Sequence, residues 1–183
     1  MRKKIVTIFL AIVLLVVPTY VYAYGTNISL PGKLELGVKR VGYWISPGCE
    51  YTVSIPKAAE NWEKPGWWNP INLFHVAESR YSNIDFNQSN SASNANATTM
   101  VYLKGGAPGS WNKPWRYVVI TLMESNMGKR ERYKNIGTII HEMGHAFGLD
   151  DINNRHSIMH YTSDKINYKV TKDANDAVAR KYP

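Results

Sequence analysis

The stretch that most constrains this chain of 183 residues is His141-Glu142-Met143-Gly144-His145-Ala146-Phe147-Gly148-Leu149-Asp150-Asp151. Apolar residues recur at helical spacing from residue 135 to residue 147, which predicts a helix with one buried face. Residues four apart share a helix face, so His141 and His145 can direct two nitrogens at one cation. Glu142 lies beside them. The stretch therefore predicts a metal site on a largely buried helix.

The residues after His145 supply a helix end and a third ligand. Gly148 can adopt a positive φ, which ends the helix and turns the chain back across the metal. That turn brings Asp151 to the histidines, with Asp150 and His156 as rival candidates. Neutral imidazole and carboxylate suit Zn²⁺, and three protein ligands leave a fourth position open for catalysis. A purely structural histidine pair is the alternative reading.

The extended pattern His-Glu-x-x-His-x-x-Gly-x-x-Asp resembles the motif of the metzincin clan of zinc endopeptidases. A second segment, Ser157-Ile158-Met159-His160-Tyr161, resembles the Met-turn, and its residues are similar to those of astacins and serralysins. The residues of the zinc-binding motif and the closing helix at 173–182 are more similar to a matrixin catalytic domain. The resemblance implies an α+β, metzincin-like domain: a twisted, mostly parallel sheet with an antiparallel edge strand, an active-site helix and a C-terminal helix.

The same resemblance implies roles for individual residues. His141, His145 and Asp151 would bind Zn²⁺, and Glu142 would accept the proton of the zinc-bound water and pass it to the leaving amine. Tyr161 would bind the metal or steady the oxyanion; a packed turn tyrosine is the alternative. Met159 would form a hydrophobic floor without direct chemistry.

This chain departs from the resembled families in three respects. Most members have histidine where Asp151 stands, and a carboxylate should make the zinc a weaker Lewis acid. Cys49 lacks the Pro-Arg-Cys-Gly context of the matrixin inhibitory segment, so latency through this thiol is not expected. The matrixin loops for structural zinc and calcium are not recognisable in residues 87–114, and neither ion is carried over.

Other functional classes fit less well. No glutamate follows Glu142, so the downstream ligand of a gluzincin is missing. Cys49 has no His and Asn arrangement around it, and nucleophilic catalysis is not expected. Without residues 1–23 the chain has 19 basic and 14 acidic residues, a net charge of +5 that is spread along the chain, and an acidic residue interrupts the densest basic run, 129–132, so we expect no nucleic-acid partner.

The N-terminus predicts export. Met1-Arg2-Lys3-Lys4, the apolar run 5–17, Pro18 and Val21-Tyr22-Ala23 form a signal-peptide pattern over residues 1–23. An uncleaved anchor is the alternative, and only then would the protein meet a membrane. Residues 24–33 are predicted to be a flexible arm, followed by one catalytic domain at 34–183, secreted and monomeric.

Alternating patterns, apolar runs and turn residues predict the remaining elements. A peptide substrate would add beside Thr98–Leu103 as an extra strand. We expect His75, His156 and His160 outside the ligand set, and the tryptophans in core and loop packing. The predicted strands are 34–45, 51–55, 71–77, 84–86, 98–103 and 115–122, the predicted helices are 56–62, 135–147 and 173–182, and 87–97 is a surface loop.

The sequence thus predicts a secreted zinc-dependent endopeptidase that hydrolyses extended polypeptides by Glu142-assisted attack of zinc-bound water. The alternative is an exported, catalytically silent zinc-binding module that binds a protein partner. Glu142, the residue on which turnover depends, is present and favours the enzyme.

Overall fold

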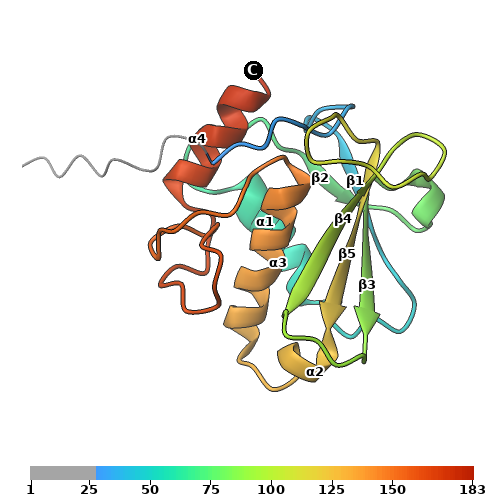
Figure 1. The fold of residues 1–183 in the computed structure, drawn as a ribbon, viewed down its shortest axis with the longest axis vertical. Coiled ribbons are helices and arrows are strands. Elements are labelled where there is room, and N and C mark those ends of the chain that lie inside the picture. The colour runs from blue at the N-terminus through green and yellow to red at the C-terminus, as the bar shows by residue number, and fades with distance from the viewer. Residues whose placement is uncertain (1–27) are drawn as a thin grey trace, which may run out of the picture.

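The computed structural model describes residues 28–183 (Figure 1). The predicted signal peptide, residues 1–23, and residues 24–27 of the predicted arm lie outside the described residues. None of the helices in the described part combines the length and the apolar character needed to cross a membrane.

The fold is α/β and is built on a five-stranded mixed sheet with the strand order β2-β1-β3-β5-β4. Neighbouring strands are parallel except for β4 and β5, which form an antiparallel pair at one edge. This confirms the predicted mostly parallel sheet with an antiparallel edge strand, although the class is α/β and not α+β. The strands are β1 (Val41–Ile45), β2 (Leu73–His75), β3 (Ile84–Ser89), β4 (Ala97–Tyr102) and β5 (Tyr117–Met123).

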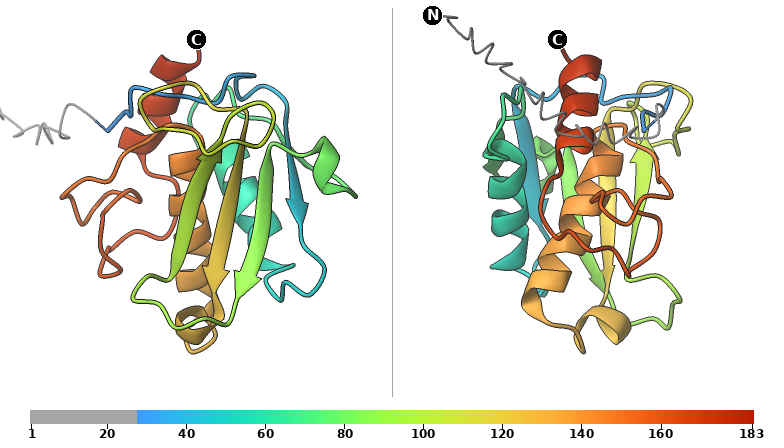
Figure 2. Two further views of the ribbon diagram at one scale, coloured as in Figure 1. Left: turned by 45° about the vertical axis from the view of Figure 1, so that its right-hand side comes forward. Right: turned by 90° about the vertical axis from the view of Figure 1, so that its left-hand side faces the viewer.

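Two helices, α1 (Ser54–Glu63) and α3 (Arg132–Ala146), pack against each other and against the sheet (Figures 1 and 2). Burial alternates along β5, so that every second side chain enters the core and its neighbours lie at the opposite face. The short helix α2 (Glu124–Met127) follows β5, and α4 (Lys172–Lys181) lies beyond the C-terminal end of α3. These are the four α-helices of the described residues.

Tryptophan side chains anchor α3 in the core. Trp62 Nε1 donates to Ile140 O at 2.9 Å, and Trp115 Nε1 donates to Ala146 O at 3.2 Å. Both indoles are fully buried, as predicted, and Trp62 also packs edge-on against Phe147. The prediction of packed tryptophans was wrong for Trp67 and Trp68, which are exposed.

The predicted strand 71–77 is shorter in the structure, Leu73–His75, and three other predicted elements also differ from those observed. Residues 51–55 are not a strand, because Ile55 N donates to Tyr51 O and the chain is already turning into α1. Of 34–45 only Val41–Ile45 is a strand, since Gly37 has a φ of +74° and makes a turn. The predicted loop 87–97 is shorter, because β3 runs on to Ser89 alongside β5.

The prediction of a flexible arm is wrong for residues 28–33. Ile28 is buried, and Leu30 N donates to Gly148 O at 2.9 Å. Asp150 N in turn donates to Ile28 O at 2.6 Å. The segment therefore packs against the chain that follows α3, where its backbone groups find partners.

Candidate metal centre

The C-terminal end of α3 positions the three predicted ligands. Gly148 has a φ of +84°, as predicted, and lies just beyond the helix. Its N–H donates to His145 O at 2.9 Å, and Leu149 N donates to Gly144 O at 3.0 Å, the hydrogen-bond pair of a Schellman cap. This cap reverses the chain, so that Asp151 lies opposite the two histidines of the helix.

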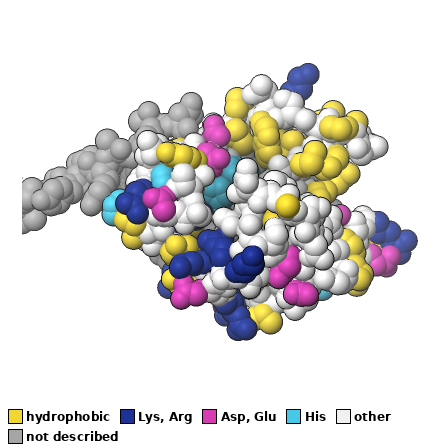
Figure 3. Space-filling view, turned by 60° about the horizontal axis from the view of Figure 1, so that its bottom comes forward, with side chains coloured by type: hydrophobic (Ala, Val, Ile, Leu, Met, Phe, Trp, Pro, Cys, Tyr) yellow, Lys and Arg dark blue, Asp and Glu magenta, His cyan; other side chains and the backbone are white. Residues whose placement is uncertain are grey.

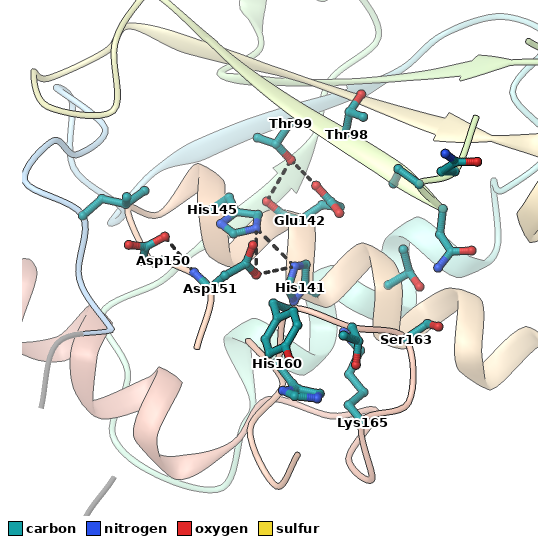
Figure 4. Close-up of a pocket in the computed structure, with 18 of the residues that line it drawn as sticks. Thr98, Thr99, His141, Glu142, His145, Asp150, Asp151, His160, Ser163 and Lys165 are labelled. Atoms are coloured by element: carbon teal, nitrogen blue, oxygen red, sulfur yellow. Dashed lines mark hydrogen bonds and ion pairs between the residues drawn. The ribbon is translucent and has the colours of Figure 1, made fainter. Parts of the chain in front are cut away.

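Three potential metal ligands converge on one point (Figure 4). His141 Nε2 and His145 Nε2 are 3.1 Å apart. Asp151 Oδ1 lies 3.2 Å from the nitrogen of His141 and 3.6 Å from that of His145. The structure therefore brings together the three residues that the sequence predicts as ligands.

The hydrogen bonds of the other imidazole nitrogens determine which nitrogen carries the lone pair. His141 Nδ1 lies 2.9 Å from Ile158 O, and His145 Nδ1 lies 2.9 Å from Leu149 O. A carbonyl oxygen only accepts, so each Nδ1 carries the proton and each Nε2 is left with a lone pair. Burial, the largest cause, lowers the pKa of His141 and keeps this imidazole neutral.

Two lone pairs and a carboxylate oxygen thus face one another with no proton between them, which is unfavourable unless a cation lies among them. Ligands held by tetrahedral zinc at about 2.0–2.2 Å lie roughly 3.3–3.6 Å from each other. The observed separations of 3.1, 3.2 and 3.6 Å are close to that range. Imidazole nitrogen favours zinc over magnesium or calcium, so the donor set fits Zn²⁺.

Glu142 lies beside the ligands and is fixed by the edge strand. Its side chain is buried, and Oε2 accepts a hydrogen bond of 2.6 Å from Thr99 Oγ1 in β4. This bond leaves Oε1 with no hydrogen-bond donor within the described residues. A carboxylate held next to a cation site, with one oxygen available, can exchange a proton with a water or an amine there.

The ligands and Glu142 lie in a cavity of about 680 Å³ between β4, α3 and the segment 160–165. In the space-filling view histidine atoms are visible in a hollow of the surface, with acidic side chains on one side and hydrophobic ones on another (Figure 3). The volume lies within the range of roughly 300–1,000 Å³ that small-molecule sites occupy. The cavity can therefore admit several residues of a peptide.

The rival ligands take other positions. Asp150 lines the cavity, but its Oδ1 accepts from Asp151 N at 2.9 Å and is not part of the converging group. His156 lies at a different surface hollow, beside Lys169 and Lys172. Of the three candidates, only Asp151 belongs to the converging group.

The other histidines also lie outside the ligand set, as predicted. His160 is buried at the cavity wall, where Nδ1 is 3.2 Å from Ile152 O and Nε2 is 3.2 Å from Asp164 Oδ1. His75 ends β2 and packs near the ring of Tyr43. Cys49 is buried away from the cavity, and burial raises the pKa of its thiol, which makes it a poor nucleophile.

The turn at 157–160 packs beneath the ligand helix. His160 N donates to Ser157 O at 3.3 Å, and Met159 is fully buried. A Cβ on Gly144 would lie 2.4 Å from Met159 Sδ, so only glycine lets the helix approach this sulfur. Met159 therefore forms a floor under the helix turn between His141 and His145.

Tyr161 follows this turn and lines the same cavity. Its side chain is 58% exposed, and among the described residues no hydrogen bond joins its hydroxyl to a ligand or to Glu142. A role for Tyr161 in binding the metal or the oxyanion stays a prediction.

Sequence reasoning missed three residues of the site. Thr99 holds Glu142, the Trp111 ring lies 6.2 Å from that of His145, and Lys165 enters the cavity from the loop before α4. The register of β4 against α3 and the path of the loops bring them here. Thr98–Leu103 was correctly predicted as the strand beside the site, which was the available signal for Thr99.

Neither a protein-family model nor a curated protein sequence matches this chain.

Proposed function

We propose that this chain is a zinc-dependent endopeptidase of the metzincin type, with a matrixin-like catalytic domain and Asp151 as the third zinc ligand. The observation that carries the proposal is the convergence of His141, His145 and Asp151 without a proton between them, next to Glu142. The position of Met159 beneath the ligand helix and the closing helix α4 support the resemblance to this clan.

His141, His145 and Asp151 would hold the zinc ion. When bound, zinc supplies a Lewis acid that polarises the scissile carbonyl and lowers the pKa of a water molecule. Glu142 accepts the proton of the attacking water and then donates it to the leaving amine. Thr99 orients Glu142 through its hydroxyl group, and Ile158 O and Leu149 O hold the two imidazoles in the ligand tautomer.

The substrate is an extended polypeptide that adds beside β4. This strand is the last in the sheet, so one side of its backbone has no partner strand within the described residues. At its C-terminal half the following loop occupies that side, since Gly109 N donates to Val101 O. The half at Ala97–Met100 contains Thr99 and lies next to Glu142, where main-chain hydrogen bonds would align a peptide with the zinc site.

Hydrolysis of an unfolded protein tests the proposal. Zinc-loaded protein should cleave it, a chelator should abolish cleavage, and added zinc should restore it. Glu142→Gln keeps the size and an acceptor for Thr99 but cannot take a proton, so it should bind zinc normally and lose activity by at least about 10²-fold. Activity that resists the chelator, or that survives in the zinc-loaded variant, contradicts the mechanism.

A zinc-loaded wild-type protein that cleaves nothing would favour the silent binding module. Removal of residues 1–23 by a signal peptidase would make the enzyme a secreted one. Mass spectrometry of the exported protein tests this: an N-terminus at Tyr24 supports secretion, and an intact N-terminus indicates an anchor.

A further inference from the structure

Lys165 is a buried cation in the wall of the zinc cavity. Its side chain belongs to the loop between the 157–160 turn and α4, and only 6% of its surface is exposed. Burial, as the main cause, lowers the pKa of its ammonium group to about 8. Burying an ammonium group costs free energy unless it finds acceptors or an opposite charge, so its partners matter.

This ammonium group has fewer hydrogen-bond partners than N–H donors within the described residues. Lys165 Nζ donates to Ile158 O at 3.2 Å, the same carbonyl that accepts from His141 Nδ1. An ammonium group has three N–H donors, and this is its only hydrogen bond within the described residues. No carboxylate oxygen of residues 28–183 lies within 4 Å of it. Two donors thus remain for a ligand in the cavity.

The charges around Lys165 do not neutralise it by contact. Glu142 and Asp151 attract it from a distance, Glu142 more strongly, and Arg130 repels it. Glu142 is already held by Thr99, and Arg130 Nη1 donates to Thr138 Oγ1 at 2.9 Å. An incoming carboxylate at this end of the cavity would therefore meet the ammonium group of Lys165, whereas Arg130 does not line the cavity and binds the lining residue Thr138.

The position of Lys165 in the cavity indicates which residue of a bound peptide it could contact. Figure 4 shows Asp150 at one end of the group and Ser163 and Lys165 at the other, beyond His141. In the proposed reaction Glu142 protonates the leaving amine, so the residue that carries this amine lies on the Glu142 side of the metal. Lys165 lines the same cavity as Glu142, at the end away from Asp150, where it can contact the side chain of the residue that carries this amine.

The lining at this end suits a polar side chain. Ser163 and Thr138 carry hydroxyl groups, and Thr138 lies one helical turn before Glu142 in α3. An apolar side chain would leave the two free donors of Lys165 unsatisfied, whereas a carboxylate would accept from them.

Resting on the proposed function, we propose that Lys165 determines specificity by binding the carboxylate of an aspartate or glutamate that directly follows the scissile bond. The substrates are then acidic polypeptides. The competing explanation is a purely structural role, in which Lys165 only donates a hydrogen bond to Ile158 O. Substitution of such a lysine would affect the cleavage of all peptides alike, whatever their side chains.

Peptides of one alanine-rich host sequence, blocked at both ends, test the proposal. They differ only in one central residue, which is Glu or Gln, and mass spectrometry identifies the bond that is cut. Wild-type protein should cleave before Glu with a kcat/KM on the order of ten- to a hundredfold above that for Gln, as expected for a hydrogen bond between charged groups. Lys165→Met should bring this ratio to about one, and Lys165→Arg should keep most of it.

Lys169→Met is the matched control, because Lys169 is exposed on the same segment and lies outside the cavity. It removes the same charge and should leave the Glu-to-Gln ratio unchanged. A wild-type ratio near one, or an equal ratio in wild type and Lys165→Met, overturns the proposal. A carboxylate could also come from the C-terminus of a peptide. A host peptide that ends in a leucine with a free carboxylate tests this source, since a stronger preference for it than for internal Glu would also overturn the proposal.

Peptide binding keeps this test separate from that of the proposed function. If the zinc-loaded protein cleaves neither peptide, the endopeptidase proposal fails, but fluorescence anisotropy with labelled Glu and Gln peptides still tests Lys165. Tighter binding of the Glu peptide to wild type, lost in Lys165→Met and kept in Lys169→Met, supports the carboxylate site. Equal binding of both peptides by all proteins overturns it.

Discussion

Gly148→Ala tests the turn that carries Asp151 to the histidines. The glycine has a φ of +84°, a conformation that costs an alanine roughly 1–2 kcal/mol. A Cβ here would lie 2.4 Å from Lys181 Cε and 2.9 Å from Gly32 O. The lysine stem can move, but the backbone oxygen cannot easily do so, and overpacking of this kind costs roughly 1–3 kcal/mol.

The loss of chain entropy in the unfolded state offsets about 0.4–1 kcal/mol of this cost. We therefore expect Gly148→Ala to lower the free energy of unfolding by about 1–4.5 kcal/mol, measured by urea denaturation of metal-free protein. Metal-free protein is required because zinc binding would itself add stability.

Gly48→Ala is the matched control. Gly48 has a nearly equal φ of +88°, but a Cβ there would have no atom within 4 Å. Its free energy of unfolding should fall only by the conformational cost of the positive φ, about 0–1.5 kcal/mol after the same offset. Equal losses in the two variants would show that packing against Gly32 contributes nothing. An unaffected Gly148→Ala protein would refute the left-handed turn, and with it the placement of Asp151.

Three further substitutions test other parts of the site. Asp151→Ala should weaken zinc binding by more than the roughly 10–100-fold that loss of an outer-shell partner costs, and Asp151→His should restore most of it, as competition with a chromogenic chelator can measure. Thr99→Val should lower kcat/KM by about tenfold at unchanged zinc affinity, because Glu142 loses its hydrogen bond; an equal loss of zinc binding would contradict this role. Trp62→Phe should cost about 1–3 kcal/mol in urea denaturation, because it removes the bond to Ile140 O and part of a fully buried ring, whereas exposed Trp68→Phe should stay within about 0.5 kcal/mol.

The convergence of His141, His145 and Asp151 could be predicted because its geometry is local. His141 and His145 are one helical turn apart, and Gly148 and Asp151 follow within six residues, so helix periodicity and one left-handed residue determine their arrangement. The edge strand was predictable for a similar reason, since β-branched and apolar residues precede a glycine-rich turn.

Predictions failed where tertiary contacts outweighed a local pattern. Tyr51 and Ile55 alternate with polar residues as in a strand, yet they are also four apart. Ile55 already belongs to α1, and its N–H donates to Tyr51 O. Residues 28–33 have a composition typical of a flexible arm. Their backbone nevertheless pairs with Gly148 and Asp150, partners that lie far along the chain.

The second layer of the site illustrates the same limit. The tautomer of His141 depends on Ile158 O, and this carbonyl also accepts from Lys165. The loop that supplies both groups has no helical or strand periodicity, so nothing local predicts which of its side chains turns inward. In the proposed enzyme the two groups are linked, because the carbonyl that would direct a ligand nitrogen at the zinc also accepts from the cation that would select the substrate. A substitution in this loop can therefore alter metal affinity and specificity together, and zinc binding has to be measured in each Lys165 variant before its peptide preference is interpreted.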